Sequence, residues 1–161
     1  MDPQIFSYFL LPDYTGTFGM TLDEISNSYT ELSLLFSPYY TISNYYVNML
    51  AFNVDENTEK ITAFRMVIND GIASSDIHTI LSSKYNYYQN NDENTMFAYR
   101  DGNSQETSKI MIIYNAETGI ISFFDLENYT SNSSTQSQKS IWKEDLSNND
   151  ELAIAKSMLI M

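Results

Sequence analysis

Cysteine is absent from this chain of 161 residues, and histidine occurs once, as His78. Without thiols the protein has no disulfides, no thiol nucleophile, no zinc–thiolate site and no iron–sulfur cluster. A single histidine cannot build a multi-histidine metal site. Glycine is also scarce, with five residues, and the glycine-rich loops that bind nucleotide phosphates are missing. The sequence therefore predicts no catalytic, cofactor-binding or metal-ligating residue, and no enzyme activity.

Basic side chains are few: eight Lys and Arg face 21 Asp and Glu, which gives a net charge of −13. Because the basic residues are scattered singly, no basic patch can neutralise phosphates, and we expect no nucleic-acid partner. No run approaches the about 18 consecutive apolar residues of a transmembrane helix. The acidic balance predicts a soluble protein that would attract a basic partner.

Aromatic residues are abundant, with 13 Tyr, 9 Phe and 1 Trp, and 43% of the chain is hydrophobic. Three tyrosine pairs stand out: Tyr39/Tyr40, Tyr45/Tyr46 and Tyr87/Tyr88. Such residues either pack as strand formers or present a binding face. Neighbouring residues on a strand point to opposite faces, so at most one tyrosine of each pair could serve one platform.

Helical spacing predicts two helices. The first is preceded by a capping box, with Thr21 as N-cap and Glu24 three residues later, and should end before Pro38. Its apolar stripe consists of Leu22, Ile25, Tyr29 and Leu32. The second begins at Ser74 or Ser75. Its stripe consists of Ile77, Ile80, Leu81 and Tyr85.

Short stretches rich in aromatic, β-branched and other apolar residues predict strands joined by short polar loops. The predicted strands cover residues 44–54, 60–68, 95–99, 110–114 and 120–126. Residues 55–58 and 115–119 are interpreted as hairpin loops, the second with Gly119 in the left-handed conformation.

The order of elements predicts an α+β fold, with helices packed on one face of a mainly antiparallel sheet. Residues 1–127 form the predicted domain, with an alternative division into two consecutive helix–sheet units at about 12–71 and 72–127. Two short echoes favour a repeat: Asn-Tyr-Tyr-x-Asn at Asn44 and Asn86, and Asp-Glu-Asn-Thr at Asp55 and Asp92.

The end of the chain has a different composition. Of residues 128–140, 11 of 13 are Ser, Thr, Asn or Gln, which indicates a polar linker or loop. Residues 141–161 favour a C-terminal helix docking on the domain, with Leu152, Ala155 and Leu159 on one face.

Acidic loop residues are the remaining candidates for chemistry. Asp55, Glu56 and Glu59 form one cluster, and Asp92 with Glu93 forms another; both are interpreted as solvated loop tips. The stretch 101–106 superficially resembles a calcium loop, but its glycine stands at the second place instead of the sixth. A plain hairpin loop is the favoured interpretation.

The heptapeptide Gly19-Met20-Thr21-Leu22-Asp23-Glu24-Ile25 resembles a turn that opens a helix in small bacterial envelope and secreted proteins. These are proteins like the small lipoprotein of the barrel-assembly machinery and the β-lactamase inhibitor protein. The aromatic stretch 45–54 is similar to the strand that follows in them. The resemblance implies a helix packed on an antiparallel sheet, a unit that the inhibitor repeats twice, and a non-catalytic binding role. No functional residue is carried over.

Composition and resemblance together favour a non-catalytic protein-binding module of a bacterial secreted or envelope protein, binding another protein through its Tyr-rich sheet or its loops. The alternative is an acidic cytoplasmic inhibitor or immunity-type protein that neutralises a basic partner. Met1 to Leu11 lacks the basic region of a signal peptide, so a secreted location would mean that the signal has been removed.

Overall fold

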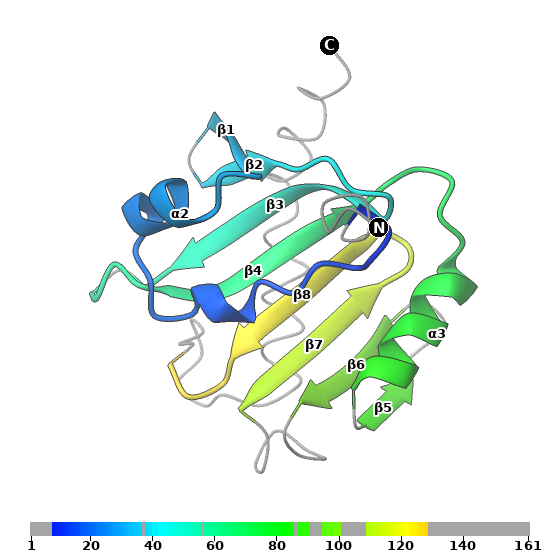
Figure 1. The fold of residues 1–161 in the computed structure, drawn as a ribbon. Coiled ribbons are helices and arrows are strands. Elements are labelled where there is room, and N and C mark those ends of the chain that lie inside the picture. The colour runs from blue at the N-terminus through cyan, green and yellow to red at the C-terminus, as the bar shows by residue number, and fades with distance from the viewer. Residues whose placement is uncertain are drawn as a thin grey trace.

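The computed structural model describes residues 8–36, 38–55, 57–85, 87–90, 95–100 and 109–128 of the chain (Figure 1). These ranges contain a short 3-10 helix, η1 (Thr15–Thr17), and two α-helices, α2 (Leu22–Ser28) and α3 (Ser74–Lys84). The strands are β1 (Ser33–Phe36), β2 (Tyr39–Thr41), β3 (Val47–Val54), β4 (Ile61–Ile68), β5 (Tyr87–Asn90), β6 (Thr95–Arg100), β7 (Ile110–Asn115) and β8 (Ile120–Asp125). The predicted α+β class is confirmed.

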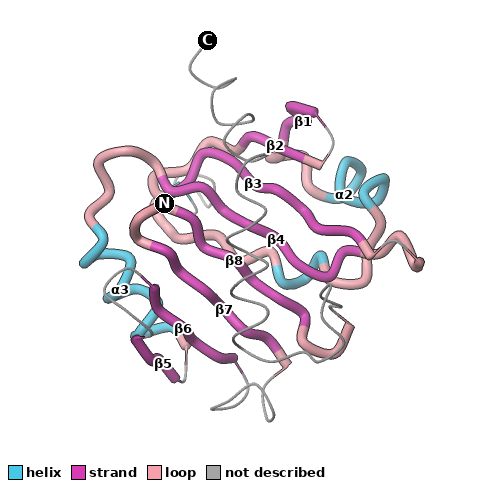
Figure 2. Tube along the Cα trace, turned by 180° about the vertical axis from the view of Figure 1, so that it is seen from behind, coloured by secondary structure: helices cyan, strands magenta, loops and turns pink. Residues whose placement is uncertain are grey.

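The strands form one sheet in the order β1-β2-β3-β4-β8-β7-β6-β5 (Figure 2), and every pairing is antiparallel. Each helix is thus followed by four strands that pair in sequence order. The two four-stranded sets join through β4 and β8 in the middle of the sheet. This is the element order of two consecutive helix–sheet units.

The sequence echoes do not follow that arrangement. Asn44 stands just before β3, the third strand of the first set, whereas Asn86 stands just before β5, the first strand of the second set. Repeated residues in a duplicated unit would fall at equivalent strands. The Asn-Tyr-Tyr-x-Asn echo therefore does not mark equivalent positions of the two sets, and the second copy of the other echo, at Asp92, lies outside the described residues.

The predicted hairpins form where polar residues separate two apolar strands. β3 and β4 pair with Phe52 opposite Phe64, and their loop begins with Asp55, whose side chain accepts the N–H of Asn57 at 2.8 Å. In the β7–β8 hairpin Gly119 has φ +71°, the left-handed conformation that the sequence predicts there. Both pairs of strands match the predicted segments to within a few residues.

The core lies on one face of the sheet, where aromatic rings meet across the junction of the two sets. Phe64 of β4 stacks on Phe123 of β8, with ring centroids 4.6 Å apart and planes 11° apart. Ile25 of α2 and Ile77 and Leu81 of α3 are fully buried in the same hydrophobic cluster. The opposite face is buried as well, with a second cluster that consists of Tyr39, Met49, Ala51, Val67 and Ile120.

The two helices agree with prediction to different degrees. Thr21 forms the predicted capping box with Glu24, but α2 ends at Ser28, and residues 33–36 form strand β1 where the helical stripe would continue. The prediction of helix through Leu32 was wrong because Asn and Ser at the end of α2 are weak helix formers and the ladder with β2 satisfies the following backbone groups. α3 begins at Ser74 as predicted.

Several sequence predictions fall on residues outside the described ranges. These are the polar segment 128–140 beyond Asn128, the C-terminal segment 141–161, the loop 101–106, and the cluster of Asp92 and Glu93. Within the described ranges, neither α2 nor α3 has the length and apolar character that a membrane-crossing helix needs.

Candidate binding site

The N-terminal segment, residues 8–14, runs across the core face of the sheet toward η1 (Figure 1). Its inward side chains anchor it: Leu11 and Tyr14 are 4% and 6% exposed and belong to the core cluster. The Tyr14 ring lies edge-on to Phe64, with centroids 6.3 Å apart, and to Tyr29 at 5.5 Å. The segment is therefore fixed over the centre of the domain.

A buried asparagine ties this segment to the loop between β2 and β3. The Asn44 side-chain nitrogen donates to the Leu10 carbonyl at 2.9 Å, and its side-chain oxygen accepts the N–H groups of Tyr46 at 2.8 Å and Val47 at 3.2 Å. The Tyr45 N–H donates to the Tyr8 carbonyl at 2.9 Å. Residues 34 or more positions apart in sequence are thereby held side by side.

This junction gathers exposed apolar side chains. Tyr8, Phe9, Leu10 and Tyr45 are 39%, 55%, 48% and 45% exposed, and we call these four residues the aromatic patch. Ring centroids are 4.9 Å apart for Tyr8 and Phe9, and 5.7 Å for Phe9 and Tyr45. In the described part of the chain, Leu34 on β1 is the one other large hydrophobic residue with such exposure. Contiguous exposed apolar groups mark interaction surfaces more often than scattered ones do.

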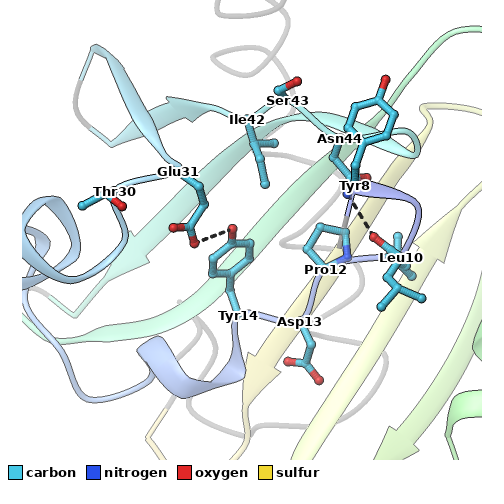
Figure 3. A pocket seen from close by; sticks show the side chains of 11 residues that line it. Tyr8, Leu10, Pro12, Asp13, Tyr14, Thr30, Glu31, Ile42, Ser43 and Asn44 are labelled. Atoms are coloured by element: carbon cyan, nitrogen blue, oxygen red, sulfur yellow. Dashed lines mark hydrogen bonds between the residues drawn. The ribbon is translucent and has the colours of Figure 1, made fainter. Parts of the chain in front are cut away.

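A cleft of about 800 Å³ lies beside the aromatic patch (Figure 3). The N-terminal segment forms one wall, from Tyr8 to Tyr14. Thr30 and Glu31, which follow α2, and the β2–β3 loop form the other. The volume is in the range of ligand-binding clefts, about 300–1,000 Å³.

A tyrosine–carboxylate pair lines the cleft. The Tyr14 hydroxyl donates to Glu31 Oε1 at 3.2 Å (Figure 3). Burial raises the pKa of the Tyr14 hydroxyl above its ordinary value, and the negative charge of Glu31 raises that pKa further. Tyr14 therefore remains a neutral donor at neutral pH. Asp13 also lines the cleft, but its carboxylate accepts the Thr15 N–H at 2.9 Å and points away from the Tyr14–Glu31 pair. None of the residues that line the cleft is Lys or Arg.

A smaller cleft of about 280 Å³ lies near the β3–β4 loop and contains Asp55, Lys60 and Asp125. Its carboxylates serve turns: Asp125 accepts the Glu127 N–H at 3.2 Å and the Asn128 side-chain nitrogen at 2.8 Å. This cleft also carries its own cation, Lys60. The hydrogen bonds within these turns are sufficient to explain the positions of Asp55 and Asp125.

The predicted acidic cluster at the β3–β4 loop is a turn. Asp55 accepts the N–H groups of Asn57 and Thr58, and Glu59 is exposed with φ +60°. Glu56 lies outside the described residues. No group of three His, Cys, Asp or Glu residues in the described ranges is placed to hold a metal ion.

His78 is half-buried on α3 and packs edge-on against the Tyr114 ring, with centroids 5.6 Å apart. Of the tyrosine pairs, Tyr39 and Tyr40 are both buried, in the clusters on opposite faces of the sheet, as the strand periodicity predicts. Tyr45 is exposed, whereas Tyr46 is half-buried against the core. The side chains of Tyr87 and Tyr88 lie outside the described set. Only Tyr45 among the described pairs therefore contributes to an exposed surface.

Sequence reasoning missed the aromatic patch and the cleft. Both arise where residues 8–14 meet residues 30–31 and 42–45, and no local spacing signals that meeting. Comparisons of the chain with protein-family models, curated protein sequences and solved structures gave no match. The geometry of the site itself therefore carries the functional argument.

Proposed function

We propose that this chain is a non-catalytic protein-binding module whose contact surface is the aromatic patch. The observation that carries the proposal is the concentration of exposed large apolar side chains at one junction, while Tyr39, Tyr40, Tyr85 and Tyr114 are buried. Tyrosine and other aromatic anchors contribute most of the binding energy in many protein interfaces. The loops, rather than a tyrosine-lined sheet face, are thus the binding element of this proposal.

Rigidity supports the same proposal. The patch is held by the Asn44 side chain and by the Tyr45–Tyr8 backbone hydrogen bond. A preformed surface loses less conformational entropy on binding than a loose one. The proposed setting is a bacterial secreted or envelope protein. The sequence resemblance supports this setting. The order of one helix followed by four strands, present twice in the chain, is compatible with the repeated unit of that family.

An acidic inhibitor of a basic partner is the second candidate. The net charge of −13 and the carboxylate of Glu31 at the cleft favour it. Binding that depends mainly on exposed charge weakens as ionic strength rises, because the Debye length falls from about 10 Å at 0.1 M to about 3 Å at 1 M salt. Binding by the aromatic patch should persist at the higher salt.

The experiment selects peptides from a displayed random library on the wild-type protein and measures their affinity for two variants. The double variant Phe9→Ser/Tyr45→Ser removes the patch, and Leu34→Ser is the control, since Leu34 is 59% exposed on β1. Selected peptides should bind the double variant at least about tenfold more weakly, a difference of about 1.4 kcal/mol, and the control unchanged. Equal affinity for all three proteins would refute the proposal.

A further inference from the structure

We propose that the cleft beside the aromatic patch receives a Lys or Arg side chain of the protein bound at that patch. This inference rests on the proposed function and names the chemistry of the partner. The Glu31 side chain is exposed and projects from the wall that follows α2 toward Tyr14 (Figure 3). Asp13 also lines the cleft, but its carboxylate points away from Glu31 and accepts the Thr15 N–H at 2.9 Å.

The hydrogen bonds of the cleft favour a cation over an anion. The Tyr14 hydroxyl donates a hydrogen bond to Glu31, and because burial raises its pKa further above neutrality, the hydroxyl stays protonated. Its donation to Oε1 orients the carboxylate and still leaves acceptor capacity, since a carboxylate has about four lone-pair sites on its two oxygens. Guanidinium and ammonium groups are the donors that match such acceptors.

Charge complementarity points the same way. Lys84 donates to the Leu11 carbonyl at 3.2 Å, but its side chain does not line the cleft. The Glu31 carboxylate therefore faces the cleft with no lysine or arginine among the lining residues, in a chain of net charge −13. An anionic ligand would be repelled, whereas a cationic side chain would be drawn toward the site.

The neighbouring aromatic patch explains why a side chain of a larger partner, rather than a free cation, is the occupant. Tyr8 belongs to the aromatic patch and also lines the cleft. The aliphatic stem of Lys or Arg can cover apolar surface while its charged end reaches a carboxylate. A guanidinium can also stack on an aromatic face. One partner segment can thus occupy both features.

The test uses the peptides selected on the wild-type protein. Each selected Arg is replaced by citrulline, which has the same shape without the charge, and affinity is measured on the wild type, on Glu31→Gln and on Glu127→Gln. Glu127 is exposed after β8, so its substitution removes one equal charge away from the cleft. Each variant is first checked for a native circular dichroism spectrum.

We expect an excess of Arg or Lys in the selected peptides and about a threefold to fivefold loss on the Arg-to-citrulline change or on Glu31→Gln, the upper end of the range for a solvent-exposed ion pair. The two changes together should cost little more than either alone, and Glu127→Gln should have little effect. Peptides that need the patch but contain no cation, or equal losses on Glu31→Gln and Glu127→Gln, would overturn this inference and leave the proposed function standing. Failure to select any patch-dependent peptide would overturn both.

Discussion

Truncation of Phe64 tests whether the two strand sets share one core. Phe64 lies on β4, opposite Phe123 of β8, at the junction through which the sets pair. Its side chain is fully buried, and its ring contacts four others. Those rings are Phe123 at 4.6 Å, Phe18 at 5.7 Å, and Tyr14 and Phe52 at 6.3 Å between centroids.

The expected effect is large because the site cannot easily collapse. A buried Phe→Ala change costs about 3–5 kcal/mol in transfer free energy and cavity formation. With four aromatic neighbours around the vacated space, we expect Phe64→Ala in the upper half of that range. The milder Phe64→Leu should cost about 1–1.5 kcal/mol, since it keeps most of the volume. The control Phe9→Ala, at a side chain 55% exposed, should change stability by at most about 0.5 kcal/mol.

Equilibrium unfolding in urea, followed by circular dichroism, measures these differences. With a slope of about 2 kcal/mol per molar urea, Phe64→Ala should lower the midpoint by about 2 M. The transition should remain single, because the two sets share the β4–β8 ladder and the cluster around Phe64. A double-mutant cycle of Phe64→Leu and Phe123→Leu should give a coupling of about 0.5–1.5 kcal/mol for the stacked pair.

Two results would contradict this reasoning. A loss of less than about 1 kcal/mol for Phe64→Ala would mean that the ring is not confined as the structure shows. A wild-type transition in two separate steps would mean that the sets unfold independently and that the β4–β8 junction does not couple them.

Three further predictions address single residues. Asn44→Ala should lower the free energy of unfolding by about 1–3 kcal/mol, because the Leu10 carbonyl and two backbone N–H groups lose their partner. Hydrogen exchange at the amides of Tyr46 and Val47 should become faster, and unchanged exchange would contradict the prediction. Gly119→Ala should lower the free energy of unfolding in urea by about 1–2 kcal/mol, because its φ of +71° is left-handed; an added Cβ would meet nothing within 4 Å, so steric clash is not the cause. The control Gly16→Ala should be near neutral, and equal costs for the two variants would show that backbone conformation is not the cause. Because the pKa of Tyr14 is raised in the folded state, its contribution to stability is present below the unfolded-state pKa of about 10 and is lost as pH rises above it. The wild type should therefore lose stability between about pH 9 and 11.5 more steeply than Tyr14→Phe does. Parallel pH profiles of the two proteins would refute the link.

The sequence alone was sufficient to predict those elements in which the residues that interact are close together in the chain. The Ile77–Leu81 stripe of α3 repeats at helical spacing, and both side chains are fully buried. The hairpin at Gly119 likewise needed only a short apolar run on each side and one residue suited to a left-handed turn. Helix capping by Thr21 belongs to the same class.

Only the tertiary structure decided the rest. Residues 33–36 lie before Pro38, where the sequence predicted that the first helix would end, yet they form β1 because β2 offers them a hydrogen-bonded partner. The β4–β8 pairing joins strands that are more than 50 positions apart, and the aromatic patch depends on a hydrogen bond between Asn44 and Leu10, 34 positions apart. Local patterns fix which face of an element is apolar, but they do not fix which distant segment will cover it. That choice follows from packing the whole chain at once, and the candidate site is a product of it.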